Sequence, residues 1–206
     1  MNVIVFLYEY IYTAGFNGLL AARLFARYGL IPYFFYTALE TFNFQGYISA
    51  LTSMFIHAGI IHLAGNMLFL FVFGARIESA FGHVKYLLFY MFCGFVGAVV
   101  YTIIAMQAGY PDFFIPAVGA SGAISGVLGA YIVLYPSSEI IALLGYFIIP
   151  ARAFWFIGLW FLIQLLYVLA GINNGVAYWA HIGGFAAGIF VALLARSFVK
   201  RDEEFL

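Results

Sequence analysis

The sequence predicts an all-α membrane protein with six transmembrane helices. Of the 206 residues, 67% are hydrophobic and only 8% are charged, whereas soluble domains typically have about 25% charged residues. Several uncharged stretches are long enough for a helix of about 20 residues, which crosses the hydrocarbon core of a bilayer. This composition excludes a soluble globular protein and a disordered one, because too little polar surface is available. The single cysteine, Cys93, excludes a disulfide scaffold.

Charged residues and turn residues divide the chain into the six expected spans. The first span contains Glu9, and its helix runs to about Tyr12 or further toward Gly18. The apolar run from Ile140 to Pro150 has about 11 residues, which is too short to cross a bilayer. The spans are expected at 2–12, from 60 to before 76, within 86–111, within 113–138, and in the two halves of 153–195 on either side of Asn173-Asn174-Gly175.

The distribution of Lys and Arg sets the expected orientation, because these residues favour the cytoplasmic side. With the N-terminus inside, six of the eight basic residues lie on the inner side and two on the outer side. Both termini are therefore expected to be cytoplasmic, and the expected location of this multi-pass protein is a prokaryotic cell membrane. The inner residues are Arg76, Lys85, Arg152, Arg196, Lys200 and Arg201, and the outer ones are Arg23 and Arg27.

The segment between the first two spans, about 28–59, then forms an interfacial outer loop between helices 1 and 2. It is rich in aromatic residues and carries no charge after Glu40. Two interpretations stay open: aromatic side chains at the membrane interface, or a structured hairpin half-sunk in the bilayer that also contacts a lipid-borne ligand. The aromatic residues are Tyr33, Phe34, Phe35, Tyr36, Phe42, Phe44 and Tyr47.

The chain is expected to form one membrane domain over residues 1–206, since neither an internal repeat nor a second domain is visible. Eight Lys and Arg residues balance eight Asp and Glu residues, so nucleic acid is not an expected partner. The lipid bilayer is the expected environment, and the oligomeric state stays open.

A few polar residues lie in or beside the apolar segments. Burying a polar group in lipid is costly, so each is a candidate for function. No Asp, Glu, Lys or Arg lies at the centre of spans two to six, which argues against a proton pump or an ion-coupled transporter. These polar residues are His57, His62, Asn66, Gln107, Ser121, Ser125, Gln164 and His181.

His62 and Asn66 lie four residues apart and therefore share one face of a helix. Both side chains can donate hydrogen bonds, and a polar contact between membrane helices is the alternative interpretation. His57 lies five residues before His62 and precedes the helix. A metal or haem site is not expected, because the spacing does not fit and no carboxylate or cysteine completes a ligand set.

The segment Gly119-Ala120-Ser121-Gly122 places a serine between glycines at the start of an expected helix. Backbone N–H groups at a helix start are unpaired, and they can stabilise an oxyanion. A serine N-cap would explain the same pattern, so both interpretations stay open at this point.

Glycine pairs indicate how Ser121 and His181 could meet. Gly122-xxx-Gly126 follows Ser121, and Gly184-xxx-Gly188 follows His181. Such faces let two helix backbones approach closely. Counted to the expected inner ends of their spans at 136, 196 and 76, Ser121, His181 and His62 lie 15, 15 and 14 residues away. At about 1.5 Å per residue, the three side chains are expected at similar depths.

Three motifs on three apolar helices occur in a specific order. They are His57-Ala-Gly-Ile-Ile-His62-Leu-Ala-Gly-Asn66, Gly119-Ala-Ser121-Gly122 and Ala180-His181-Ile-Gly-Gly184-Phe-Ala-Ala-Gly188, with weaker matches at Phe73-Gly74 with Glu78, Gly82-His83 and Gly158-Leu-Trp160-Phe. This pattern resembles the rhomboid family of intramembrane serine proteases over about residues 52–195. The resemblance implies a six-helix rhomboid-like bundle with a water-filled cavity open to the outside.

The resemblance also implies roles for the motif residues. Ser121 would be the nucleophile and His181 the general base. The oxyanion hole would be formed by His62, Asn66 and the Ser121 backbone N–H. Substrates would be transmembrane proteins, cleaved near the outer membrane face, and no cofactor would be needed. Supporting positions would be His57, Gly119, Gly122 and Ser125.

Two departures from the family pattern concern the surroundings of the site. Ser125 stands where many rhomboids have an aromatic residue that stacks on the histidine, and the outer loop lacks the tryptophan of a Trp-Arg pair found in some members. Since no Asp or Glu is available to orient His181, we expect a dyad rather than a triad. Two other functions stay open: a catalytically inactive relative that binds membrane helices, and a small polar-lined channel or transporter.

Overall fold

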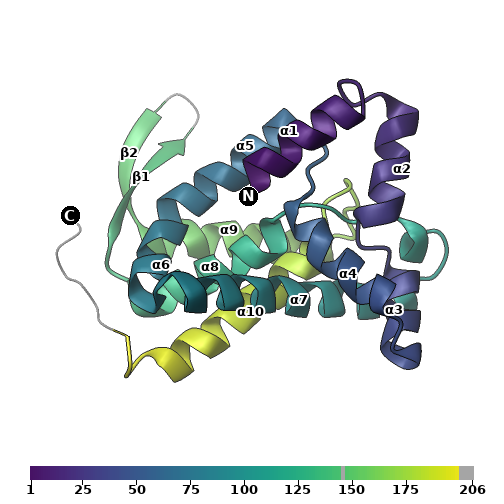
Figure 1. Ribbon diagram of the computed structural model, residues 1–206. Coiled ribbons are helices and arrows are strands. Elements are labelled where there is room, and N and C mark those ends of the chain that lie inside the picture. The colour runs from purple at the N-terminus through teal and green to yellow at the C-terminus, as the bar shows by residue number, and fades with distance from the viewer. Residues whose placement is uncertain (145–146, 200–206) are drawn as a thin grey trace.

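The structure is a computed structural model that describes residues 1–144 and 147–199. Helices and one two-stranded antiparallel hairpin make up this part of the chain (Figure 1). Lys200 and Arg201, which contribute to the expected orientation, lie outside the described residues. The elements are α1 (Asn2–Tyr12), α2 (Gly18–Tyr28), α3 (Pro32–Thr41), α4 (Phe44–Thr52), η1 (Ser53–Phe55), α5 (Ile60–Phe69), η2 (Leu70–Gly74), α6 (Ala75–Phe81), α7 (His83–Ala108), η3 (Asp112–Phe114), α8 (Ser121–Leu134), β1 (Glu139–Leu144), β2 (Phe147–Arg152), α9 (Ala153–Leu169) and α10 (Tyr178–Ala195).

Helices α7, α8 and α10 pack closely together at the centre of the bundle. A Cβ added to Gly184 or Gly188 of α10 would collide with the backbone oxygen of Gly122 or Gly126 of α8, respectively. On another side of α10, a Cβ on Gly97 of α7 would lie 2.6 Å from a backbone oxygen. Glycine therefore sets the distance between these helices, and the two glycine faces singled out in the sequence lie against each other.

Among the residues that the structure describes, three helical segments are long and apolar enough to cross a membrane: Ile60–Phe81, His83–Ala108 and Tyr178–Ala195. The first is continuous through α5, the π-helical η2 and α6. Helices α8 and α9 are also apolar but have 14 and 17 residues, and α1 has 11. The mainly helical membrane class agrees with the prediction, whereas the count of six spans stays a prediction.

The N-terminal helix ends at Tyr12, which confirms the shorter of the two predicted ends and contradicts the extension toward Gly18. The Thr13 hydroxyl donates to the backbone oxygen of Glu9 at 2.7 Å and accepts from the Phe16 N–H at 3.0 Å. Gly15 between them has a φ of 77°, a left-handed conformation that glycine adopts without strain. The chain therefore turns and starts α2 at Gly18.

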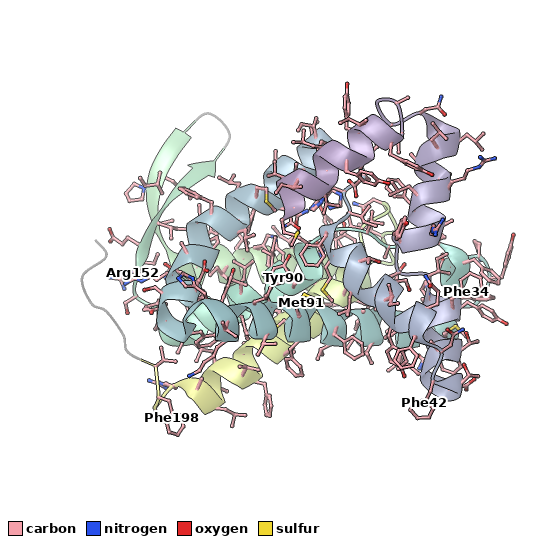
Figure 2. All side chains as sticks on the ribbon, in the orientation of Figure 1. Phe34, Phe42, Tyr90, Met91, Arg152 and Phe198 are labelled. Atoms are coloured by element: carbon pink, nitrogen blue, oxygen red, sulfur yellow. The ribbon has the colours of Figure 1, made fainter. Side chains whose placement is uncertain are left out.

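The aromatic segment between the first two expected spans is mostly helical. Helices α3 and α4 pack against each other and against α7, and the buried Phe35 ring meets Phe95 of α7 with centroids 5.6 Å apart. Phe34 and Phe42 project outward at this end of the molecule (Figure 2) and are 54% and 79% exposed. A structured hairpin thus forms there, while its depth in the membrane and any contact with a lipid-borne ligand stay predictions.

The apolar run after α8 forms the hairpin of β1 and β2, an element that the sequence reasoning did not predict. The strands pair antiparallel from Glu139 opposite Arg152 to Leu144 opposite Phe147. The β-branched Ile140 and Ile141 favour an extended conformation in a stretch too short to span a bilayer. The hairpin contacts α9 and projects away from the centre of the bundle (Figure 1).

Candidate active site

Ser121 and His181 meet through their side chains. The Ser121 Oγ lies 2.8 Å from the His181 Nε2. Ser121 is the first residue of α8, and the N-cap position belongs to Ala120, which makes no side-chain capping bond. The alternative of a serine N-cap is therefore wrong, because the hydroxyl is directed to the imidazole of α10 instead. The close contact of the glycine faces of α8 and α10 explains why the two side chains reach each other.

Gln164 of α9 contacts the other nitrogen of the same ring. Its Oε1 lies 2.8 Å from the His181 Nδ1. In the sequence, Gln164 is one of the polar residues in apolar segments, but no motif predicts a place for it in the site. The signal was present, because a glutamine in an apolar helix needs a polar partner. Which partner it meets depends on how α9 is rotated against α10.

An aromatic ring also packs against His181, although Ser125 is small. The Trp160 ring of α9 lies 5.9 Å from the His181 ring, with 34° between the ring planes. Ser125 is fully buried, and its hydroxyl donates to the backbone oxygen of Ser121 at 2.6 Å. Trp160 therefore contacts His181 from a different helix, while the small Ser125 lies in the closely packed helix α8.

His62 of α5 faces the loop that leads into Ser121. Its Nδ1 accepts a hydrogen bond from the Ala58 N–H at 3.3 Å, so the ring proton resides on Nε2. A Cβ on Gly119 would lie 2.7 Å from both the Cε1 and the Nε2 of His62. The N–H-bearing edge of the ring is thus close to the serine segment and can donate a hydrogen bond there.

Asn66 lies one turn after His62 and is mostly buried. Its Nδ2 donates to the His62 backbone oxygen at 3.0 Å, and one amide hydrogen stays available for a second acceptor. In the described part of the chain, neither His62 nor Asn66 has a side-chain hydrogen bond to another long apolar helix. The alternative of a polar contact between membrane helices is therefore not supported.

His57 supports the His62 ring from the segment before α5. It is fully buried, and its ring meets that of His62 edge-on, with centroids 5.1 Å apart. The His57 backbone N–H donates to a carboxylate oxygen of the buried Glu9 of α1 at 3.2 Å. Burial and the neighbouring His62 lower the pKa of His57 to about 4, so this ring is neutral at pH 7.

One cavity of about 760 Å³ lies against the Ser121–His181 pair. The cavity is bounded by residues of α2, α5, α7, α8, α9 and α10 and of the segments that lead into α8 and α10, and most of its other walls are apolar. Within the described residues, no group of three or more His, Cys, Asp or Glu side chains could hold a metal ion. The polar residues on its wall include Ser121, His181, His62 and Asn66.

Comparison with known proteins identifies the family to which the chain belongs. The family model described as Rhomboid domain matches residues 45–198. The chain belongs to the rhomboid family. It is 35% identical over 148 residues to RHOMBOID-like protein 1 of Arabidopsis thaliana, covering 69% of this chain and 33% of the relative. It is 33% identical over 144 residues to rhomboid protease GluP of Bacillus subtilis, covering 69% of this chain and 25% of GluP.

The match covers the motif-bearing part of this rhomboid rather than the relatives as a whole. Rhomboid protein 1, mitochondrial, of Saccharomyces cerevisiae is 29% identical over 165 residues, which are 76% of this chain and 44% of the yeast protein. The chain therefore spans less than half the length of these relatives. The Rhomboid domain and the apolar helices identify it as an integral membrane protein.

Gly119→Ala is expected to disrupt the site of this rhomboid. The φ of Gly119 is 126°, which strains an L-residue by about 1–3 kcal/mol, and the new Cβ would collide with His62. If Ser121 is a nucleophile and His62 an oxyanion donor, kcat should fall by about 10²-fold or more, as for removal of such a donor. Turnover and thermal unfolding in detergent check this, with Gly158→Ala as the control, because a Cβ at Gly158 meets open space. Wild-type kcat in Gly119→Ala would show that the close contact with His62 is unimportant.

Proposed function

We propose that the chain is a serine endopeptidase that cleaves transmembrane helices of membrane proteins near the outer face of the membrane. The observation that carries this proposal is the 2.8 Å contact of Ser121 Oγ with His181 Nε2 in a cavity among apolar helices. Similarity to a bacterial rhomboid protease supports it.

Ser121 is the proposed nucleophile and His181 the proposed general base. As the Ser121 oxygen attacks the carbonyl carbon of the scissile peptide, its proton moves to the His181 Nε2. The imidazolium then gives this proton to the leaving amine, and an acyl-enzyme remains on Ser121. Water attacks the ester with His181 as base again, which releases the acid and restores the hydroxyl. The cavity of about 760 Å³ has room for this water.

The oxyanion formed in each step needs hydrogen-bond donors. The Ser121 backbone N–H lies in the first turn of α8, where N–H groups have no partner within the helix. The Nε2–H of His62 and the free amide hydrogen of Asn66 are further donors on the same cavity wall. Donors that are already in place stabilise the developing charge without reorganisation.

The proposed substrate is a transmembrane helix, because such a segment reaches a site placed among apolar spans. A peptide carbonyl inside a helix is hydrogen-bonded and shielded, so the helix must unwind locally before Ser121 can attack. Gly or Pro near the cleaved bond would lower the cost of unwinding. We therefore propose substrates whose spans contain such residues near the outer surface.

For location and orientation we propose a prokaryotic cell membrane with both ends of the chain cytoplasmic. The support for the orientation is the excess of Lys and Arg on the proposed inner side, and similarity to a rhomboid protease of Bacillus subtilis supports the prokaryotic membrane. In this orientation α5, α8 and α10 start on the outer side, and Ser121, His181 and His62 lie near those starting ends. Water from the outer side then has a short path to the cavity.

Labelling by a fluorophosphonate probe tests the proposed function against its two rivals. An activated serine attacks phosphorus and keeps the probe covalently, whereas a channel or an inactive helix-binding relative has no such serine. We expect stoichiometric labelling in detergent, with the modified peptide mapped to Ser121 by mass spectrometry. The absence of labelling in folded protein, or labelling at another serine, would contradict the proposal.

Asn66→Ala is expected to be milder than loss of the serine or the histidine. It removes one donor of several, so kcat should fall by about 10–10³-fold with KM little changed. Steady-state cleavage of a transmembrane peptide in detergent gives both parameters. If only KM changed, Asn66 would be a substrate-binding or packing residue rather than an oxyanion donor.

A further inference from the structure

Gln164 contacts His181, and this contact has no part in the reaction steps proposed above. Its side chain is 7% exposed, and it lies on α9, an otherwise apolar helix. Its Oε1 is 2.8 Å from the His181 Nδ1, while the Nε2 of the same ring is 2.8 Å from the Ser121 Oγ. Ser121, His181 and Gln164 therefore form a continuous chain of hydrogen bonds across α8, α10 and α9.

The surroundings of Gln164 decide which way its amide points. The Gln164 Nε2 donates to the backbone oxygen of Trp160 at 3.4 Å. A backbone carbonyl only accepts hydrogen bonds, so the amide nitrogen faces Trp160 and the amide oxygen faces His181. That oxygen likewise only accepts, and the His181 Nδ1 must therefore carry the ring proton. The lone pair of the neutral ring is then on Nε2, directed at Ser121.

We propose that Gln164 is a positioning residue that holds His181 in the tautomer and orientation required of the base. The proposal rests on the proposed function and deepens it, because a Ser–His–Gln arrangement replaces the expected dyad. Gln164 does not belong to the cavity wall in the described structure, so it acts through His181 and not on the substrate.

A neutral amide suits this place better than a carboxylate would. An ionised Asp or Glu among apolar membrane helices is costly unless it is paired, whereas an amide accepts the Nδ1–H without bringing a charge. The Trp160 ring packs against the same imidazole, so a hydrogen bond and a ring contact from α9 both restrict His181. The orientation of His181 therefore depends less on which side chain stands at the position of Ser125.

Two apolar replacements and one rescue variant separate positioning from packing. Gln164→Met keeps an unbranched chain of similar length without an amide, and Gln164→Leu is a second apolar replacement if one of them fails to fold. Gln164→Glu keeps an acceptor oxygen in either protonation state. Gln107→Leu is the matched control, since Gln107 is exposed on α7 and does not belong to the cavity wall.

The measurements are kcat, KM, fluorophosphonate labelling rate and thermal unfolding in detergent. We expect Gln164→Met and Gln164→Leu to lower kcat and the labelling rate by about 10–100-fold, as for loss of a buried hydrogen bond that orients a base. KM should change by less than about threefold, and Gln164→Glu should recover most of the lost kcat. Gln107→Leu should match the wild type.

Three results would overturn the proposal. They are wild-type kcat in a folded apolar variant, a change confined to KM, and equal losses in the apolar variants and Gln164→Glu, which would make Gln164 a packing residue. Failure of the proposed function looks different, because the wild type itself would then neither cleave the peptide nor take up the fluorophosphonate.

Discussion

Ser121→Ala is expected to abolish peptide cleavage while the helix bundle stays folded. In the proposed mechanism this hydroxyl forms the acyl-enzyme, and its removal takes away one hydrogen bond to His181. The first turn of α8 keeps its backbone hydrogen bonds, so thermal unfolding in detergent should be close to that of the wild type. Turnover of a transmembrane peptide should fall to background, a loss of about 10⁴-fold or more.

The matched control is Ser137→Ala, an exposed serine beyond the opposite end of α8. It should leave both kcat and thermal unfolding unchanged. Substantial residual turnover in Ser121→Ala would contradict the assignment of Ser121 as the nucleophile. A large drop in thermal stability would instead show that the hydroxyl has a structural role that the hydrogen bonds do not reveal.

His181→Ala is expected to be as inactive as Ser121→Ala, since an unactivated serine hydroxyl is a weak nucleophile. The double variant Ser121→Ala with His181→Ala should be no less active than either single one, because residues that act as a unit give non-additive losses. The three variants are compared by single-turnover cleavage with excess enzyme. Losses that add up in the double variant would show that the two residues act independently.

The Ser121–His181 contact could be predicted from the sequence because glycine pairs indicate where two helices can pack closely. A face of small residues on each of two helices shows which sides of the helices can pack together. The residues next to these faces are then brought close to each other. Gly184 and Gly188 lie so close to α8 that no side chain fits between the helices. A sequence pattern of this kind therefore predicts a contact between residues that are 60 positions apart.

The contact of Gln164 with His181 could not be anticipated in the same way. Helix α9 is apolar on all sides, so no stripe of hydrophobic residues tells which face meets α10. Its rotation is fixed only by packing in three dimensions, including the stacking of Phe161 on Phe185 with ring centroids 4.1 Å apart. The expectation of a dyad came from the absence of Asp and Glu, and it overlooked a neutral acceptor.

The helices of the aromatic segment and the β-hairpin show a second limit of sequence patterns. Residues 28–59 are rich in aromatic residues, so their composition fits an interfacial belt and a packed helical hairpin equally well. The structure forms α3 and α4 because Phe35 and Ala38 can be buried against neighbouring helices. Local propensity alone does not decide such cases, because tertiary packing supplies most of the stabilisation.

Cleavage of a fluorescent transmembrane peptide in liposomes that contain the purified protein tests the central claim most directly. The peptide should carry a Gly or Pro near the outer end of its span, and mass spectrometry of the products locates the cleaved bond. We expect the wild type to cut near that outer end and Ser121→Ala to leave the peptide intact. Equal cleavage by both proteins, or no cleavage by folded wild type that has inserted in the bilayer, would contradict an intramembrane serine endopeptidase.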